Sequence, residues 1–162
     1  MKYERLRKEM VKRQIEARGI TDERVISAML TVPRHLFVSD ALQDQAYGDF
    51  PLPIGEQQTI SQPYIVAVMT DLLKLTPKSK VLEVGTGSGY QAAILAEVTK
   101  EVFTMEIKEK LHERSKKILT ALKYDNIRTR HGDGYFGWEE FAPFDAIMIT
   151  AAVNHVPPPL VK

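Results

Sequence analysis

The sequence contains no cysteine among its 162 residues. This absence excludes a disulfide scaffold, a thiolate metal site and a cysteine nucleophile. The sequence also has almost no net charge, because 22 lysine and arginine residues stand against 21 aspartate and glutamate residues, for a formal charge of +1. Such a balance excludes a polybasic nucleic-acid arm or an acidic tail as the organising feature.

Long hydrophobic runs are missing as well. No stretch reaches the roughly 18 apolar residues that a membrane span requires. The first ten residues, MKYERLRKEM, are charged throughout and contain no apolar segment of a secretory signal. We therefore expect a cytoplasmic protein with no membrane partner. The share of hydrophobic residues, 44%, and of charged residues, 27%, is typical of a folded domain, and the length fits one domain over residues 1–162.

Familiar catalytic and metal-binding motifs are absent too. The four histidines lack the spacing of metal ligands, and the sequence has neither a G-x-S-x-G nucleophile elbow nor a Walker lysine loop. We interpret His112 as a solvated side chain on a charged helix and His35 as structural. We therefore expect no metal site.

Two parts of the chain differ in pattern. Residues 1–76 read as helices and loops, with apolar residues at helical spacing and with Gly19 and Pro33 as stop signals. Thr21 is the expected N-cap of the second helix. Residues 47–62 are rich in proline and glycine and predict a long loop, which in compact domains usually serves function or mobility. The expected helices cover about residues 6–18, 21–32, 40–46 and 63–75.

Residues 77–162 instead alternate short apolar runs with helical stretches, which predicts an α/β fold with a doubly wound, mostly parallel sheet covered on both faces. In the strand order 3-2-1-4-5 of such folds, only four strands are present here, so we expect the sheet to lack its C-terminal strands. The fourth, very apolar strand is then expected at an open edge. The strand candidates are residues 81–84, 102–105, 126–130 and 144–150.

The strongest single signal is the segment VLEVGTGSGY at residues 81–90. Glycines after a strand allow a tight turn and let a ligand approach the main chain. The pattern E-x-G-x-G-x-G differs from the dinucleotide fingerprint, and an acid at the strand end suits the positive charges of S-adenosylmethionine better than a pyrophosphate. A mere tight turn is the alternative. The predicted donor-site residues here are Glu83, Gly85, Thr86, Gly87 and Gly89.

Two acids follow the next two strands. Glu106 lies 106 − 85 = 21 residues after Gly85, where an acid can accept both ribose hydroxyls. Asp133 stands between two glycines after the third strand, where an adenine amino group needs an acceptor. Taken alone, Glu106 could be a solvated side chain and Asp133 a turn residue. Together with the glycine loop, the two acids favour an adenosine site.

Methyl transfer would explain the shortage of catalytic motifs, because positioning supplies much of its acceleration. A carboxylate acceptor is already ionised at neutral pH and needs no general base. Thr59 and Ser61 precede the helix that starts at Pro63, whose N-terminus favours anions, and their hydroxyls could hold such a carboxylate. Alternatively, Ser61 or Gln62 merely caps that helix, and the residues alone leave both interpretations open.

Several segments, taken together, resemble protein-L-isoaspartate O-methyltransferases over about residues 10–162. The most specific are TISQP at 59–63 and GDGYFGW at 132–138, and the others are VPRHLFV at 32–38, residues 81–93 and residues 143–149. The resemblance implies a Rossmann-like methyltransferase fold that uses S-adenosylmethionine. It also implies methylation of the α-carboxyl of L-isoaspartyl residues in damaged proteins and peptides, after which the ester collapses to a succinimide that can reopen as aspartate.

The resemblance also assigns roles to residues. Ser61 matches the family's active-site serine, with Thr59 in the same loop, and Glu106 matches the ribose-binding acid. The glycines of the loop match the donor-binding motif, and Asp133 with Gly134 matches the adenine-side motif. The sequence departs from the family at Tyr64, where many members carry histidine.

The family also continues with further strands beyond the equivalent of Lys162. An inactive adenosine-binding fragment therefore stays open as an alternative. A nicotinamide-dependent oxidoreductase also stays open, although the glycine spacing and Glu83 argue against it. Nucleic acid is not an expected partner, because the charge is balanced and no Asn-Pro-Pro-Tyr-type motif is present.

Overall fold

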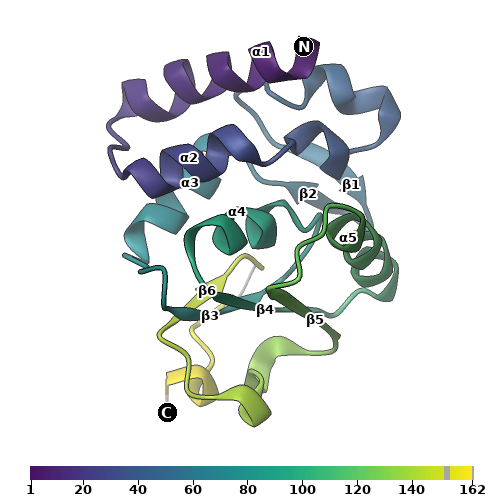
Figure 1. Ribbon diagram of the computed structural model, residues 1–162. Helices are drawn as coiled ribbons and strands as arrows, with labels where there is room; N and C mark the ends of the chain where they lie inside the picture. Colours follow the sequence, from purple (N-terminus) through teal and green to yellow (C-terminus); the bar gives the residue numbers. More distant parts are fainter. Residues whose placement is uncertain (152–153, 162) are drawn as a thin grey trace.

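The computed structural model describes residues 1–151 and 154–161, so Lys162, the end of the expected domain, lies outside the described residues. Figure 1 shows the layers of the molecule. Helices α4 and α5 cover one face of a sheet, and the N-terminal helices lie over α4 and α5. The segment after β5 covers the other face of the sheet. The two termini lie at opposite ends of this stack.

The N-terminal helices follow the predicted pattern, with a different cap. Helix α1 (Lys2–Met10) continues through a π turn and a 3-10 turn to Gly19, whose φ of 93° ends it in the left-handed region. Helix α2 (Glu23–Thr31) starts after Asp22, whose side chain accepts a hydrogen bond from the Arg24 N–H. The expected cap at Thr21 is therefore wrong by one residue, since Asp is an equally good N-cap.

The remaining helical turns are short. Residues Arg34–Phe37 and Asp40–Gln45 form 3-10 turns, so the helix expected at 40–46 is a tighter and shorter element. Helix α3 (Pro63–Leu72) begins with its proline at the first turn, as predicted. None of the helices among residues 1–151 and 154–161 is long and apolar enough to cross a membrane.

The stretch predicted as a long loop contains a β-hairpin instead. Strand β1 (Leu52–Gly55) pairs antiparallel with β2 (Gln58–Ile60). The two residues between them, Glu56 and Gln57, have φ of 50° and 57°. A type I′ hairpin turn has positive φ at both central positions, and glycine, asparagine or aspartate normally supplies it. The sequence therefore carried no recognisable hairpin signal.

The main sheet matches the prediction closely. Its strands are β3 (Lys80–Val84), β4 (Glu101–Glu106), β5 (Ile127–His131) and β6 (Ala146–Ile149), each within two residues of its predicted bounds. All pairs are parallel, in the order β5-β4-β3-β6, which is the expected 3-2-1-4. Helices α4 (Tyr90–Val98) and α5 (Glu109–Ala121) connect the first three strands. Among the described residues, β6 pairs with β3 alone.

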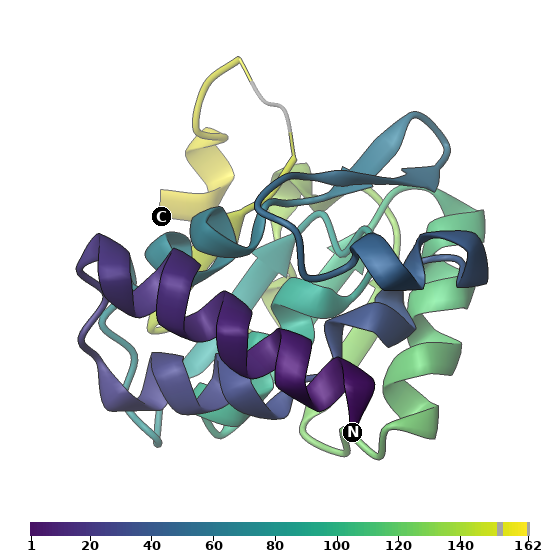
Figure 2. The same ribbon diagram turned by 90° about the horizontal axis from the view of Figure 1, so that it is seen from above.

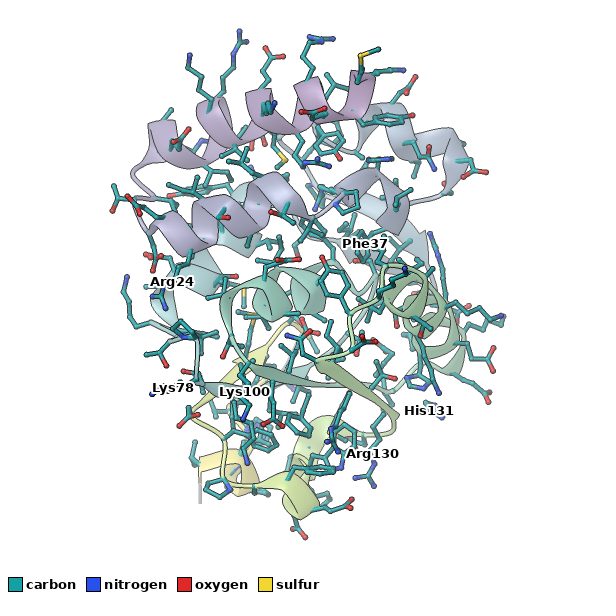
Figure 3. The ribbon with its side chains drawn as sticks, viewed as in Figure 1. Arg24, Phe37, Lys78, Lys100, Arg130 and His131 are labelled. Carbon is teal, nitrogen blue, oxygen red and sulfur yellow. The ribbon has the colours of Figure 1, made fainter. Side chains whose placement is uncertain are left out.

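The sheet has a different core on each face. On the helical side, Phe37 lies among interior side chains (Figure 3), 5.5 Å edge-on from Tyr90. Lys78 and Lys100, in contrast, are exposed. On the other side, Phe103 packs edge-on against Trp138 at 5.6 Å. Burying such an aromatic ring contributes roughly 1.5–3 kcal/mol.

The second face is covered without an α-helix. Only 3-10 turns, at Gly134–Phe136 and Glu139–Phe141, lie in the described connection between β5 and β6. Aromatic side chains of this connection therefore cover this face of the sheet, in place of the apolar face of a helix. Asp133 follows two residues after the end of β5 at His131 and lines the cavity at the carboxyl ends of the strands. Figure 2 shows the hairpin of β1 and β2 at the edge of the molecule away from the N-terminus.

Candidate functional site

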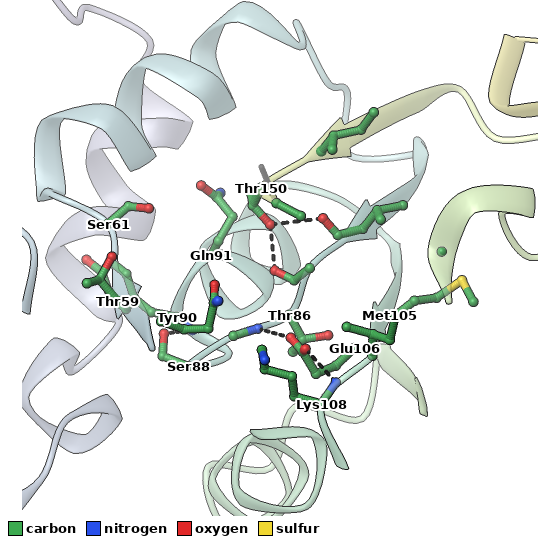
Figure 4. Close-up of a pocket in the computed structure, with 18 of the residues that line it drawn as sticks. Thr59, Ser61, Thr86, Ser88, Tyr90, Gln91, Met105, Glu106, Lys108 and Thr150 are labelled. Atoms are coloured by element: carbon green, nitrogen blue, oxygen red, sulfur yellow. Dashed lines mark hydrogen bonds between the residues drawn. The ribbon is translucent and has the colours of Figure 1, made fainter. Parts of the chain in front are cut away.

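A cavity of about 370 Å³ opens at the carboxyl ends of β3, β4 and β6, and Figure 4 shows the residues around it. In open α/β sheets, ligands bind at this edge, and the volume lies in the usual range for small-molecule sites. The predicted residues that line the cavity come from the hairpin, the glycine loop, the end of β4 and the segment after β5. They are Thr59, Ser61, Gly85, Thr86, Gly87, Glu106, Asp133 and Gly134.

The glycine loop turns back against the end of β4. The Gly85 and Thr86 N–H groups both donate to the Met105 carbonyl, at 2.8 and 3.1 Å. Gly85 has a φ of 102°, and a Cβ there would lie 3.0 Å from the Thr150 hydroxyl oxygen. Conformation and space therefore both require glycine at this position.

Glu106 faces the cavity from the end of β4 and is buried. One carboxylate oxygen accepts a hydrogen bond from the Gly87 N–H at 2.7 Å, and the other accepts one from the Lys108 N–H at 2.9 Å (Figure 4). The alternative interpretation as a solvated glutamate is therefore wrong. A carboxylate oxygen has two lone pairs, so each oxygen can still accept a hydrogen bond from a ligand hydroxyl.

Glu83 does not occupy the place expected for it. Its side chain is fully buried and absent from the cavity lining. Oε1 accepts a hydrogen bond from the Thr104 hydroxyl at 2.6 Å, while Oε2 has no partner among the described residues. Burial raises the pKa of Glu83 to about 8, the Thr104 hydrogen bond opposes this shift, and the nearby Glu106 charge adds to it. This raised pKa favours the protonated, neutral carboxyl over the negative charge that was expected beside a sulfonium.

Gly89 is also displaced from the expected contact. It precedes α4 with a φ of 88°, and a Cβ there would lie 3.2 Å from Ser115 Cβ on α5. It does not line the cavity. Glycine at this position therefore allows α4 and α5 to approach each other closely.

Asp133 and Gly134 line the cavity from the segment after β5. Asp133 Oδ1 accepts a hydrogen bond from the Tyr135 N–H at 2.9 Å, so the turn role considered from the sequence is present. A Cβ on Gly134 would overlap the Val84 side chain. Glycine therefore lets this segment lie directly on the end of β3, with Asp133 at the rim of the cavity.

Thr59 and Ser61 line the cavity from the hairpin and the residue after it, across from Glu106 and Lys108 (Figure 4). The N-cap of α3 is Gln62, which makes no side-chain capping hydrogen bond and instead donates to Asp49 Oδ1 at 2.7 Å. The alternative that Gln62 caps the helix is therefore confirmed in position, although the Gln62 side chain makes no capping hydrogen bond.

The hairpin is held against α5. Arg114 donates a hydrogen bond to the Ile54 carbonyl at 3.1 Å, and Lys110 lies 3.5 Å from the Glu56 carboxylate. The second contact is exposed and worth at most about 1 kcal/mol. These contacts fix the side of the cavity that carries Thr59 and Ser61.

Other lining residues were not predicted, among them Gln91, Lys108, Tyr135 and Thr150. The Thr150 hydroxyl donates to the Gly85 carbonyl at 2.5 Å and lies 3.2 Å from the Val84 carbonyl. Thr150 is the last residue of the fourth predicted strand. Since the carboxyl ends of parallel strands meet at one edge, this position did carry a signal.

The histidines give a mixed outcome. His35 stacks on Tyr3 at 4.0 Å and lies 2.8 Å from the Tyr47 hydroxyl, which confirms a structural role. His112 stacks on His131 at 5.8 Å, with Nδ1 buried and without a partner among the described residues. His112 is therefore half-buried, so the expected solvated side chain is only partly correct.

Comparisons with known proteins identify relatives of the whole chain. The family described as protein-L-isoaspartate(D-aspartate) O-methyltransferase (PCMT) matches residues 4–162. A protein-L-isoaspartate O-methyltransferase 2 from Shewanella sediminis is 66% identical over 98% of the chain, and a Picosynechococcus protein-L-isoaspartate O-methyltransferase is 59% identical over 97%. The chain spans 65% of the first relative's length and 71% of the second's.

Solved structures agree on the fold. A protein-L-isoaspartate O-methyltransferase superposes with a TM-score of 0.87 at 30% identity, over 96% of this chain and 51% of that one. A beta-aspartate methyltransferase (PCMT) from Plasmodium falciparum, in complex with S-adenosyl-L-homocysteine, superposes with a TM-score of 0.78 at 26% identity, over 98% of this chain and 78% of that one. The architecture is therefore the Rossmann-like methyltransferase fold expected from the sequence.

Proposed function

Because the chain belongs to the protein-L-isoaspartate(D-aspartate) O-methyltransferase family, we propose that its cavity binds S-adenosylmethionine for protein repair. The whole protein would transfer the methyl group to the α-carboxyl of L-isoaspartyl residues in proteins and peptides. The observation that carries this proposal is that the glycine loop and Ser61 line one cavity. Donor and acceptor residues therefore meet at a single place.

The residues of the cavity fit an S-adenosyl ligand. Glu106 offers two carboxylate oxygens to ribose hydroxyls, and its bonds to the Gly87 and Lys108 N–H groups orient it. Asp133 stands at the rim, where it can accept the adenine amino group. Gly134 keeps that rim close to Val84, because any larger residue would collide with the Val84 side chain.

Bound S-adenosylmethionine supplies an activated methyl group, and the chain supplies the positioning. Ser61 and Thr59 present hydroxyl donors from the hairpin side, suited to holding a carboxylate. The N-terminus of α3 follows directly at Pro63 and favours negative charge there. An acceptor carboxylate is ionised at neutral pH, so holding it in line with the methyl group is the main task of these residues.

We predict that Ser61→Ala, in the whole protein, lowers methyl transfer about 10- to 100-fold, because it removes a hydrogen bond to a charged group. The affinity for S-adenosylhomocysteine should stay nearly unchanged, since Ser61 lies on the acceptor side. Transfer of labelled methyl to paired peptides, identical except for isoaspartate or aspartate at one position, measures the effect.

The matched control is Ser39→Ala, because Ser39 is exposed and does not line the cavity. It should leave both transfer and affinity unchanged. Unaltered transfer to the isoaspartyl peptide by a folded Ser61→Ala protein would remove Ser61 from the acceptor site. Equal labelling of both peptides by the unsubstituted protein would contradict the proposed repair function itself.

A further inference from the structure

The last three residues of β4 hold the first three residues of the glycine loop, one after another. The Met105 carbonyl accepts from the Gly85 and Thr86 N–H groups, and the Glu106 carboxylate accepts from the Gly87 N–H. A fourth contact comes from Thr104, whose hydroxyl oxygen lies 2.5 Å from the Thr86 hydroxyl oxygen. The loop therefore depends on β4 for its position.

The Thr104 contact is part of a buried chain of hydrogen bonds. Thr104 is fully buried, does not line the cavity, and donates to Glu83 Oε1 at 2.6 Å. In the short contact either hydroxyl can be the donor, because each carries one proton and can also accept. The three side chains thus form one hydrogen-bonded chain that joins Thr86 through Thr104 to Glu83.

This chain rests on a rigid part of the fold. Glu83 and Thr104 are register partners on the adjacent central strands β3 and β4. Thr86, in contrast, belongs to the loop and lines the cavity. In a buried place a hydroxyl that loses its partner is costly, so the chain resists displacement of the loop.

We propose that Thr104 is a positioning residue of the donor cavity, which fixes Thr86 and with it the backbone of Gly85 and Gly87. It touches no ligand and acts through the loop alone. The functional part of this inference rests on the proposed function, since it takes an S-adenosyl compound as the ligand. The structural part does not need a ligand and can be tested without one.

The test compares Thr104→Val, which keeps the shape but removes the hydroxyl, with Thr104→Ser, which keeps the hydroxyl. Amide hydrogen exchange on the ligand-free protein should be about fivefold faster or more at Gly85, Thr86 and Gly87 in Thr104→Val, and near the original rate in Thr104→Ser. The Thr150 N–H, which donates to the Val84 carbonyl on the other side of β3, should not change.

Thr129→Val is the matched control, because Thr129 is the register partner of Thr104 on β5. It should leave the exchange of the loop amides unaltered. Thr86→Val is the second variant, which breaks the chain at its loop end while the Thr104 bond to Glu83 remains, so the core stays intact. It should accelerate the same three amides.

Calorimetry with S-adenosylhomocysteine gives the functional readout. Thr104→Val should lower its affinity about five- to tenfold, with recovery in Thr104→Ser. The proposal would be overturned if the loop amides exchange at the original rate in both Thr104→Val and Thr86→Val. It would also be overturned if Thr129→Val accelerates their exchange as much as Thr104→Val does. If Thr104→Val accelerates exchange of the loop amides but the unsubstituted protein binds no S-adenosylhomocysteine, the positioning role is supported and the proposed function is contradicted.

Discussion

Glu106→Ala should weaken S-adenosylhomocysteine binding by about 1–3 kcal/mol, or roughly 5- to 150-fold. The substitution removes the acceptor for ribose hydroxyls and also leaves the Gly87 and Lys108 N–H groups without their carboxylate. Glu106 is only 5% exposed, so water replaces these contacts poorly. Isothermal titration calorimetry measures the change directly.

Two further variants define the cause of that effect. Glu106→Gln keeps one acceptor oxygen and should give an intermediate loss of affinity. Glu101→Ala, at the opposite end of the same strand, should give none. Unchanged affinity in a folded Glu106→Ala protein would remove Glu106 from the donor site.

The second large effect concerns the pH dependence of stability. Burial raises the pKa of Glu83 to about 8 in the folded protein, whereas an unfolded glutamate has a pKa near ~4.3. Between these values the folded state binds one more proton than the unfolded state. The stability that this proton contributes is complete below the unfolded pKa and is lost as the pH rises to the folded pKa.

The unsubstituted protein should therefore lose about 1.4 kcal/mol of unfolding free energy per pH unit, relative to Glu83→Gln, between about pH 5 and 8. Glutamine has nearly the same shape and no proton to lose, so other titrating groups cancel in the comparison. Urea unfolding at four pH values measures it.

Glu101→Gln serves as control for that slope, because the Glu101 side chain is 39% exposed beside Lys100. Its stability should run parallel to that of the unsubstituted protein over the same range. A Glu83→Gln protein that also runs parallel would show that Glu83 is ionised in the folded state, and the expectation of a negative charge there would then return.

Much of the donor side of the site could be predicted from the sequence. The glycine loop, Glu106 and Asp133 each follow a predicted strand, and parallel strands bring their carboxyl ends to one edge. The positions of these residues directly after strands therefore predicted that they lie close together in the fold. The same reasoning did not place Glu83 correctly, because successive side chains of a strand point to opposite faces of the sheet. The Glu83 side chain is buried in the core and does not line the cavity.

The acceptor side was less predictable. The hairpin that carries Thr59 turns at Glu56 and Gln57, residue types that rarely adopt positive φ, so nothing local marked it. Thr104 lies in the middle of strand β4, where a threonine gives no special signal because β-branched residues are common in strands. Its importance depends on Thr86 and Glu83 meeting it in space, and only the folded structure contains that information.

The most direct test of the account is a calorimetric titration of S-adenosylhomocysteine and, separately, of NADH into the 162-residue chain. The central claim is that the cavity between the glycine loop, Glu106 and the hairpin holds an S-adenosyl donor. We predict one molecule of S-adenosylhomocysteine bound per chain and no detectable binding of NADH. Binding of NADH at comparable affinity, or no binding of S-adenosylhomocysteine to the folded chain, would contradict the claim.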